Sequence, residues 1–336
     1  MNICEDPSLF APFIARLILL CLSFVTPSAF AIFQVSVPLL EEQTRDAPEA
    51  QTRAVTQVLE RITGQDVDPN GRLAGVLQEP ARWIQSSGFL TELDEVSRVV
   101  TYTVDPGIAS RVRAMQLPVW LEPRPPQWLW LVIDEGLGRE ALTADSSGEL
   151  ARALRAQAER WQLPLALPQW DAQDLSLVSY GELWGLFLEG VELAHARYGD
   201  EFVAGRALKR GQQWQLAVKT SAGERLTQSY LSADALAADL FRYWLEPLIN
   251  QYAVSGEGEL ELRVAGLDGQ GYRQLIRYLR SSSVIDQALP TRSTAEGVVL
   301  RVLTGARPDQ LATLLAGLPM SPVVGDETGL DWVWMP

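Results

Sequence analysis

The sequence has few of the side chains from which thiol and imidazole sites are built. Among its 336 residues there are two cysteines and one histidine, and both cysteines, Cys4 and Cys21, fall within the first 31 residues. Without that segment the chain has no thiol, which excludes disulfides, cysteine-ligated zinc and cysteine nucleophiles. Because His195 is the single imidazole, a multi-histidine metal site is excluded as well. We therefore expect neither a metal nor a cofactor.

Positive charge is also scarce. The 28 Lys and Arg residues are outnumbered by 42 Asp and Glu, which gives a formal net charge of −14, and Lys209 and Lys219 are the two lysines. No basic patch stands out along the chain, so electrostatic capture of a nucleic-acid backbone is unfavourable and we expect no nucleic-acid partner. The hydrophobic content of 47% is nevertheless enough for a sizeable core, and the length favours two or three domains.

Residues 1–31 are predicted to be a secretory signal peptide. Arg16 precedes an apolar run over 17–25, and Ala29-Phe30-Ala31 forms an Ala-x-Ala cleavage site. We expect cleavage after this motif, a periplasmic location and no membrane span in the mature protein. Two acidic residues near the start weaken the usual positive region, so the alternative is an uncleaved segment that anchors the protein in the inner membrane.

The remaining chain is predicted to form three small mixed modules in series, of the α+β or α/β class. The first, over 32–117, has the order β-α-α-β-β and a sheet covered on one side. Its expected elements are strands at 33–37, 89–93 and 99–104, a helix ending near Gly64 and a helix over 73–86. The proline-rich segment 118–127 is predicted to be a stiff linker.

The second module, over 128–253, is organised around the apolar run Trp128-Leu129-Trp130-Leu131-Val132-Ile133. This run is too short to span a membrane and is bounded by prolines and glycines, so it predicts a strand buried on both faces. Covering helices are expected near 147–162, 180–198 and 234–250, the first two beginning with capping boxes at Ser146–Glu149 and Ser179–Glu182. With the other predicted strands the order is β-α-β-α-β-β-β-α.

The third module, over 257–336, is predicted to be ferredoxin-like. Its order is β-α-β-β-α-β, with strands at 259–264, 284–289, 298–303 and 321–324 and helices at 270–280 and 308–317. Because this fold supports many unrelated functions, the prediction carries little information about activity.

Several short patterns within 33–252 resemble one protein family. They are Val58-Leu59-Glu60-Arg61-Ile62-Thr63-Gly64, Trp120 followed by Arg124-Pro125, Leu163-Pro164-Leu165-Ala166-Leu167-Pro168 with Asp171 and Asp174, and Trp184-Gly185 followed by Arg197-Tyr198-Gly199. Together they are similar to the exported proteobacterial proteins grouped as domain of unknown function 2066 (DUF2066). The resemblance implies a location in the cell envelope and no particular activity. The element order of the second module is also similar to small domains of envelope assembly proteins, such as the amino-terminal domain of the Tol translocation protein and the outer-membrane activators of peptidoglycan synthases.

A glycine motif follows the apolar run. Gly136-Leu137-Gly138-Arg139-Glu140-Ala141 has the G-x-G-x-x-A spacing of a dinucleotide fingerprint, in which backbone N–H groups bind a pyrophosphate at a helix start. Asp134 and Glu135 place negative charge at this position, and the next helix is expected to begin about ten residues too late. A flexible strand-to-helix loop is the alternative interpretation.

Carboxylates follow two predicted strands of the second module, at Asp134 and Glu135 and at Asp171 and Asp174. The ends of parallel strands are where open α/β sheets bind ligands, and paired carboxylates can serve hydrolysis or bind a divalent cation. The alternative is that Asp171 and Asp174 begin a turn and cap the next helix. His195 lies on the apolar stripe of its helix, which favours a packed histidine over a catalytic one.

Tryptophan is plentiful, and six of the 11 lie around the second module: Trp120, Trp128, Trp130, Trp161, Trp170 and Trp184. Most occupy inward positions, where core packing is expected, whereas Trp120 and Trp170 are in loops and are expected to be exposed. Exposed aromatic residues are common at protein and carbohydrate interfaces. We therefore take as candidate ligand or partner contacts Trp120, Arg124, Asp134, Trp170, Asp171 and Asp174.

These observations predict an exported, non-catalytic binding or scaffold protein of the cell envelope. Its expected partner is another envelope protein or a cell-wall component. The alternative is a hydrolase or divalent-cation-dependent enzyme that uses Asp171, Asp174 and His195. A third hypothesis is nucleotide binding at Gly136 and Gly138.

Overall fold

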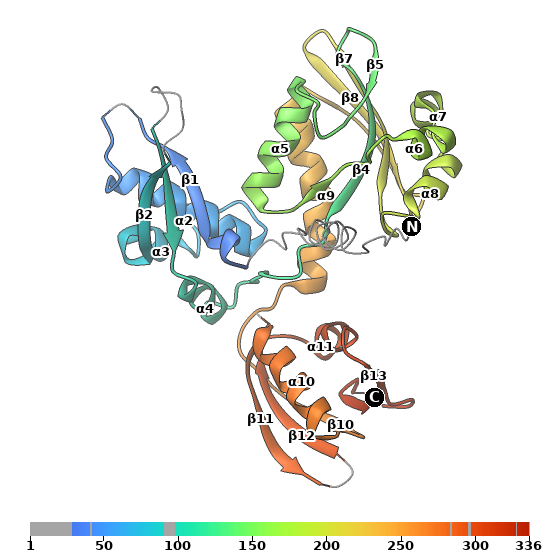
Figure 1. The fold of residues 1–336 in the computed structure, drawn as a ribbon. Coiled ribbons are helices and arrows are strands. Elements are labelled where there is room, and N and C mark those ends of the chain that lie inside the picture. The colour runs from blue at the N-terminus through green and yellow to red at the C-terminus, as the bar shows by residue number, and fades with distance from the viewer. Residues whose placement is uncertain are drawn as a thin grey trace, which may run out of the picture.

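The computed structural model describes residues 29–336 except 41, 91–97, 283, 295–296, 327 and 336. The fold is mixed α+β, with three sheets that occupy separate parts of the molecule (Figure 1). The predicted signal peptide lies almost entirely outside the described residues. Within them, no helix is both long enough and apolar enough to cross a membrane.

The first module is a three-stranded antiparallel sheet packed against helix α2. The strand order is β1-β3-β2, with β1 at Gln34–Pro38, β2 at Ile84–Leu90 and β3 at Val99–Val104, and α2 spans Pro48–Thr63. Val100, Tyr102 and Val104 are fully buried on one face, as their alternation predicts. The sheet residues between them are more exposed, so one face is covered and the other is open.

The helix predicted over 73–86 is wrong. The structure has a short helix α3 at Ala74–Leu77, a 3-10 turn at Pro80–Trp83 and then strand β2. Pro80 cannot donate a backbone hydrogen bond within a helix, which accounts for the break. The strand predicted at 89–93 begins earlier and is described to Leu90. A short helix, α4 at Gly107–Ala114, was not predicted.

The second module is a mixed sheet with helices on both faces (Figure 1). The strand order is β5-β4-β7-β8-β9, and β6 pairs with the start of β4. The strands are β4 at Gln127–Asp134, β5 at Arg139–Ala141, β6 at Leu165–Ala166, β7 at Val203–Arg210, β8 at Gln213–Thr220 and β9 at Arg225–Tyr230. The helices are α5 at Glu149–Trp161, α6 at Ala172–Leu177, α7 at Tyr180–Gly185, α8 at Glu189–His195 and α9 at Ala233–Tyr252.

Strand β4 is buried on both faces, which confirms the prediction from its apolar run. Leu129, Leu131 and Ile133 pack into the core formed with α5 and α9. Trp130 and Val132 point to the opposite face and pack with α7, α8 and the residues that flank α6. The alternation of side chains along one strand thus supplies both cores of the module.

Of the two capping boxes predicted in this module, one is present and one is absent. Ser179 forms the predicted capping box with Glu182 at the start of α7. The box predicted at Ser146 is absent, because α5 begins after Gly148 and Ser146 instead accepts a hydrogen bond from the backbone of Thr143. The long helix predicted over 180–198 is also wrong: Leu186 adopts a left-handed conformation (φ 60°) and separates α7 from α8.

The third module contains the predicted β-α-β-β-α-β order and one more strand. Its elements are β10 at Glu259–Ala265, α10 at Gly269–Ser281, β11 at Ile285–Ser293, β12 at Gly297–Thr304, α11 at Pro308–Leu315, β13 at Met320–Pro322 and β14 at Asp331–Trp334. The sheet order is β11-β12-β10-β14-β13. Strand β14 lies between β10 and β13, parallel to β10, so the module departs from a simple ferredoxin-like sheet.

Two arginines, the buried Arg61 and the half-buried Arg124, join the first and second modules. Arg61, near the end of α2, is fully buried and donates to the carbonyls of Arg160 at 3.0 Å and Glu159 at 3.1 Å in the last turn of α5. Arg124 donates to the carbonyls of Trp161 and Arg61 at 2.5 and 2.6 Å. Cations at helix C-termini oppose the negative end of the helix dipole, so both guanidinium groups stabilise this junction.

Candidate functional site

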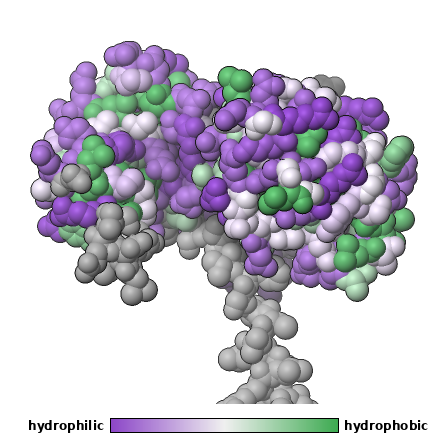
Figure 2. Space-filling model, turned by 90° about the horizontal axis from the view of Figure 1, so that it is seen from above, coloured by the Kyte–Doolittle hydropathy of each residue, from purple (hydrophilic) through white to green (hydrophobic). Residues whose placement is uncertain are grey.

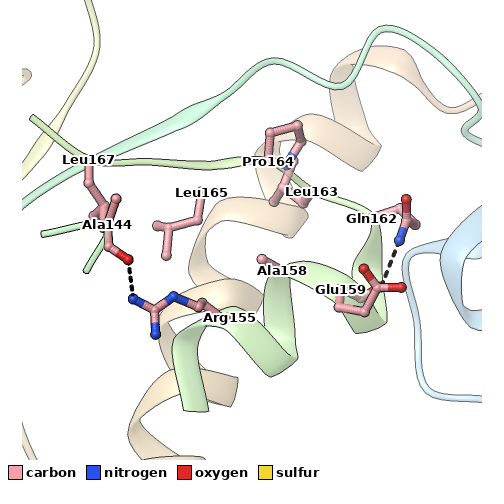
Figure 3. Close-up of a pocket in the computed structure, with 9 residues that line it drawn as sticks. All are labelled: Ala144, Arg155, Ala158, Glu159, Gln162, Leu163, Pro164, Leu165 and Leu167. Atoms are coloured by element: carbon pink, nitrogen blue, oxygen red, sulfur yellow. Dashed lines mark hydrogen bonds between the residues drawn. The ribbon is translucent and has the colours of Figure 1, made fainter. Parts of the chain in front are cut away.

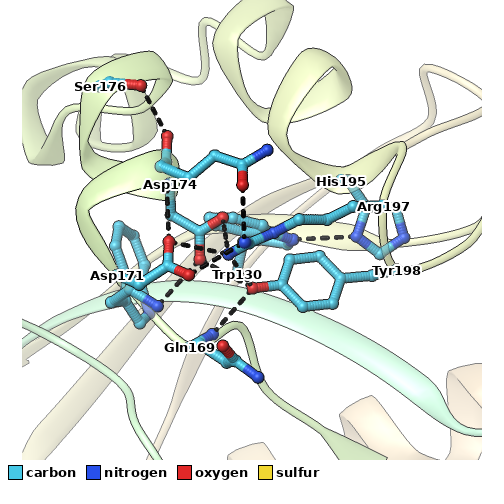
Figure 4. A network of polar contacts seen from close by, with 10 residues as sticks. Trp130, Gln169, Asp171, Asp174, Ser176, His195, Arg197 and Tyr198 are labelled. Atoms are coloured by element: carbon cyan, nitrogen blue, oxygen red, sulfur yellow. Dashed lines mark hydrogen bonds and ion pairs between the residues drawn. The ribbon is translucent and has the colours of Figure 1, made fainter. Parts of the chain in front are cut away.

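The carboxylates predicted as candidate catalytic groups are bound to an arginine. Asp171 is the N-cap of α6, where its side chain accepts the backbone N–H of Asp174 at 3.0 Å. Its two oxygens also accept two hydrogen bonds from Arg197, both at 2.9 Å (Figure 4). Both carboxylate oxygens therefore take part in one bidentate ion pair, which fixes the position of the side chain and offsets its charge.

Asp174 is more deeply placed than Asp171. It is fully buried, and its Oδ2 accepts the backbone N–H of Trp170 and the hydroxyl of Tyr198, each at 2.9 Å. Its Oδ1 lies 2.7 Å from the Arg197 guanidinium but receives no hydrogen bond of good geometry from the described residues. Arg197 therefore pairs with both carboxylates, and its one positive charge offsets one of their two negative charges.

The electrostatics of this network hold Asp171 ionised. Hydrogen bonds from Arg197 and then from the backbone of Asp174 lower the pKa of Asp171 below its ordinary value. The same hydrogen bond with Asp171 raises the pKa of Arg197. A general acid in a hydrolase needs a carboxyl whose pKa is raised, so Asp171 is shifted in the opposite direction. Among the described residues, no group of three or more His, Cys, Asp or Glu side chains could hold a metal ion.

His195 is also committed to internal bonds. Its side chain is 1% exposed, and Nδ1 accepts the indole N–H of Trp130 at 3.2 Å. Since an indole N–H can only donate, the proton of the neutral ring lies on Nε2, which donates to the carbonyl of Glu201 at 3.1 Å. Burial lowers the pKa of His195, so the ring is neutral in the fold. This neutral, fully bonded ring is a core histidine.

The prediction that Trp120 and Trp170 are exposed is wrong. Trp120 is fully buried, with its indole N–H bonded to the carbonyl of Pro123 at 2.8 Å and the guanidinium of Arg124 4.2 Å from its ring centre. Trp170 is 8% exposed and donates to the carbonyl of Leu142 at 3.1 Å. Both loops are packed, so neither tryptophan is presented to a partner. Arg124 is half-buried at the module junction, where its guanidinium is bonded to backbone carbonyls.

The glycine motif lies in a hairpin and not at a helix start. Strand β5 pairs antiparallel with β4, and Gly136 and Gly138 adopt positive φ angles of 98° and 114° in the turn between them. Asp134 stabilises the turn by accepting the N–H of Gly136 at 2.9 Å. This arrangement contradicts a dinucleotide fingerprint, which requires the glycines to open a helix.

A protein carboxylate occupies the helix start where a phosphate would bind. The side chain of Glu135 accepts the backbone N–H groups of Glu149 and Leu150, at 3.3 and 3.2 Å, in the first turn of α5. These are the donors that an anion would need at that helix N-terminus. Glu135 thus replaces the missing N-cap side chain and leaves no place for a pyrophosphate there.

A pocket of about 440 Å³ lies between α5 and the segment 163–167 (Figure 3). Leu163, Leu165 and Leu167 contribute apolar wall, together with Ala158. Arg155, the cation at its rim, donates to the carbonyl of Ala144 at 2.7 Å. Glu159 also lines the pocket, and its carboxylate lies 3.4 Å from the guanidinium of Arg61. Since both charged side chains are paired within the fold, the pocket offers mainly shape and apolar contact.

A surface that the sequence analysis missed lies on α6, α7 and α8. We call it the α6–α8 surface, and it consists of the exposed side chains of Leu175, Leu177, Tyr180, Phe187 and Leu193. Hydrophobic side chains are visible at this end of the second module in the view from above (Figure 2). The run Leu186-Phe187-Leu188 could have indicated this surface. If these three consecutive residues lay in a helix, their side chains could not all face the same core, so at least one would be exposed.

The chain matches no protein-family model, no curated protein and no solved structure.

Proposed function

We propose that this chain is an exported, non-catalytic binding or scaffold protein of the cell envelope, of the kind grouped as DUF2066. The leader-like first 31 residues support export, and a remainder without thiols suits the periplasm. Its partner would be another envelope protein or a cell-wall component.

The observation that carries the proposal is the use of every candidate catalytic side chain in internal bonds. Asp171 and Asp174 are paired with Arg197, and His195 is bonded on both ring nitrogens. A general base needs a free acceptor within reach of substrate. These groups instead hold α6 and α8 against β4, which is a structural role.

The module junctions support a scaffold. Arg61 and Arg124 fix the first module to the end of α5, and the buried Gln310 of α11 donates to the carbonyls of Gln251 and Ala253 at the end of α9. Buried, hydrogen-bonded contacts of this kind restrict relative motion of the modules. Surfaces on different modules would then be presented at fixed separations, as a scaffold requires.

Cell fractionation and crosslinking in living cells test this proposal. The chain should be released with the periplasmic fraction and should crosslink into a larger complex. The variant Asp171→Asn, checked for folding by circular dichroism, should form the same complex.

An enzymatic result would contradict it. The proposal fails if the purified chain turns over a small molecule or cell-wall fragment, and if Asp171→Asn together with Asp174→Asn abolishes that turnover while the fold is retained. Recovery of the wild-type chain in the cytoplasmic fraction would contradict export.

A further inference from the structure

We infer that the α6–α8 surface docks a basic, amphipathic segment of a partner protein. The inference rests on the proposed binding function and adds the position of the contact and the chemistry of the partner.

The core of the module is complete without these apolar side chains, which lie largely in solvent. Leu193 is 67% exposed, Phe187 is 62% exposed and Leu175 is 54% exposed. The core beneath them is already filled by other residues of the same helices, of which Leu183 and Val191 are fully buried. Single exposed leucines are ordinary, but several apolar side chains gathered on adjoining helices are typical of an interaction surface.

The helices that carry the surface are packed closely, so the surface is formed before any partner binds. At Gly190 of α8, a Cβ atom would lie 2.1 Å from the carbonyl oxygen of Leu177 at the end of α6. The capping box of Ser179 and Glu182 fixes the start of α7, and the left-handed Leu186 fixes its end. A preformed surface costs less conformational entropy on binding than a flexible one.

The charge around the α6–α8 surface indicates the chemistry of the partner. Residues 172–194 contain no Arg or Lys, whereas Glu189 and Glu192 are exposed on α8 and Glu182 lies on α7. Arg197 offsets one of the two charges of the neighbouring Asp171 and Asp174, and Arg139 and Arg206 lie over the Trp184 ring of α7. Acidic side chains therefore outnumber basic ones around this surface, within a chain of net charge −14. An anionic membrane or an acidic polymer would be repelled from this surface, and a segment that combines apolar side chains with Lys or Arg would be attracted.

Peptide titration against the purified full-length chain tests the inference. The probe is a synthetic amphipathic helical peptide of leucine and lysine, and its control is the same design with glutamate in place of lysine. We expect saturable binding of the lysine peptide and none of the glutamate peptide. The double variant Phe187→Gln and Leu193→Gln should weaken binding about tenfold or more, because both anchors are lost.

Charge variants and matched controls separate this surface from general stickiness. Glu189→Gln with Glu192→Gln should reduce the affinity and its dependence on salt. Leu231→Gln, which changes an 80% exposed leucine elsewhere on the module, and Glu246→Gln on α9 should leave binding unchanged. Each variant is first compared with the wild type by thermal unfolding.

The inference is overturned if the glutamate peptide binds as well as the lysine peptide, if the wild type binds neither, or if Leu231→Gln weakens binding as much as the double variant does. These results are independent of the proposed function, which is judged by cell fractionation and by turnover. A chain that crosslinks normally in cells but fails the titration would refute this surface and leave the proposed function standing.

Discussion

Individual polar side chains in this protein act mainly by holding its segments together. His195 is the clearest case, because its ring accepts from the indole of Trp130 and donates to the backbone of Glu201 while almost completely buried. The fold therefore stabilises the neutral ring and opposes its protonation.

This environment predicts that stability declines in mildly acidic solution. Burial lowers the pKa of His195 below its ordinary value of 6.5, so below that pH the unfolded chain binds a proton that the folded chain does not. The free energy of unfolding should be fully maintained above about pH 6.5 and should fall as the pH is lowered toward the folded-state pKa. Urea unfolding at a series of pH values measures this.

The variant His195→Gln is the control, since glutamine can keep one acceptor and one donor but does not titrate. It should remove the part of the slope that begins just below about pH 6.5. The lowered pKa of Asp171 has the same sign but acts below its ordinary value of 3.8, outside this range. As His195 is the single histidine, its NMR signals are unambiguous, and a titration midpoint at or above 6.5 in the folded protein would contradict the prediction.

Residue-scale patterns predicted some of the site correctly and misjudged other parts of it. The spacing of Asp171 and Asp174 predicted a helix cap, and Asp171 is one. The prediction for Trp120 and Trp170 failed because a position in a loop does not imply exposure. The indole N–H of Trp120 bonds to the carbonyl of Pro123, three residues away, whereas that of Trp170 bonds to Leu142, a tertiary contact without a local signature.

Among the elements, helix α5 depends on a residue outside itself. Gly148 at its N-cap has no side chain, and Glu135 in the β4–β5 hairpin accepts the N–H groups of Glu149 and Leu150 in its place. Glu135→Ala should lower the free energy of unfolding by about 1 kcal/mol, as loss of an N-cap does. Hydrogen exchange at these two amides should become faster.

Glu140→Ala provides the comparison, since Glu140 is an exposed residue of the same hairpin. It should leave the exchange of both amides unchanged. Equal exchange rates in the wild type and in Glu135→Ala would show that the cap contributes nothing to α5.

Elements with strong periodicity were predictable, whereas those set by an unfavoured backbone conformation or by a very short strand were not. The apolar run of β4 predicted burial on both faces because prolines and glycines limited its length. The break after α7 depends on Leu186 adopting a left-handed conformation that its residue type does not favour. The hairpin partner β5 was missed because three residues are too few to show alternation.

At the scale of the whole molecule, hydrogen bonds and an ion pair attach the third module to the other two. Gln310 is 7% exposed, and its amide donates to the carbonyls of Gln251 and Ala253 at 3.0 and 2.9 Å. Arg113 of α4 and Asp286 of β11 add a bidentate ion pair between the first and third modules. These contacts fix the third module beside the other two.

Gln310→Ala should loosen that attachment. Loss of two hydrogen bonds to buried carbonyls should cost about 1 to 2 kcal/mol. Limited proteolysis should cut the connection at 254–258 faster than in the wild type, whereas Gln274→Ala on the exposed face of α10 should have no effect. An unchanged cleavage rate in Gln310→Ala would argue that the junction does not depend on this side chain.

The position of β14 inside the third sheet has a consequence for the order of assembly. Because β14 separates β10 from β13, these two strands cannot be bridged before residues 331–334 have left the ribosome. The first two sheets are complete by residue 230 and do not wait for this step. During synthesis one flank of β10 therefore stays unpaired, and a chain stopped short of residue 331 would carry that bare strand edge permanently, which is a known starting point for aggregation.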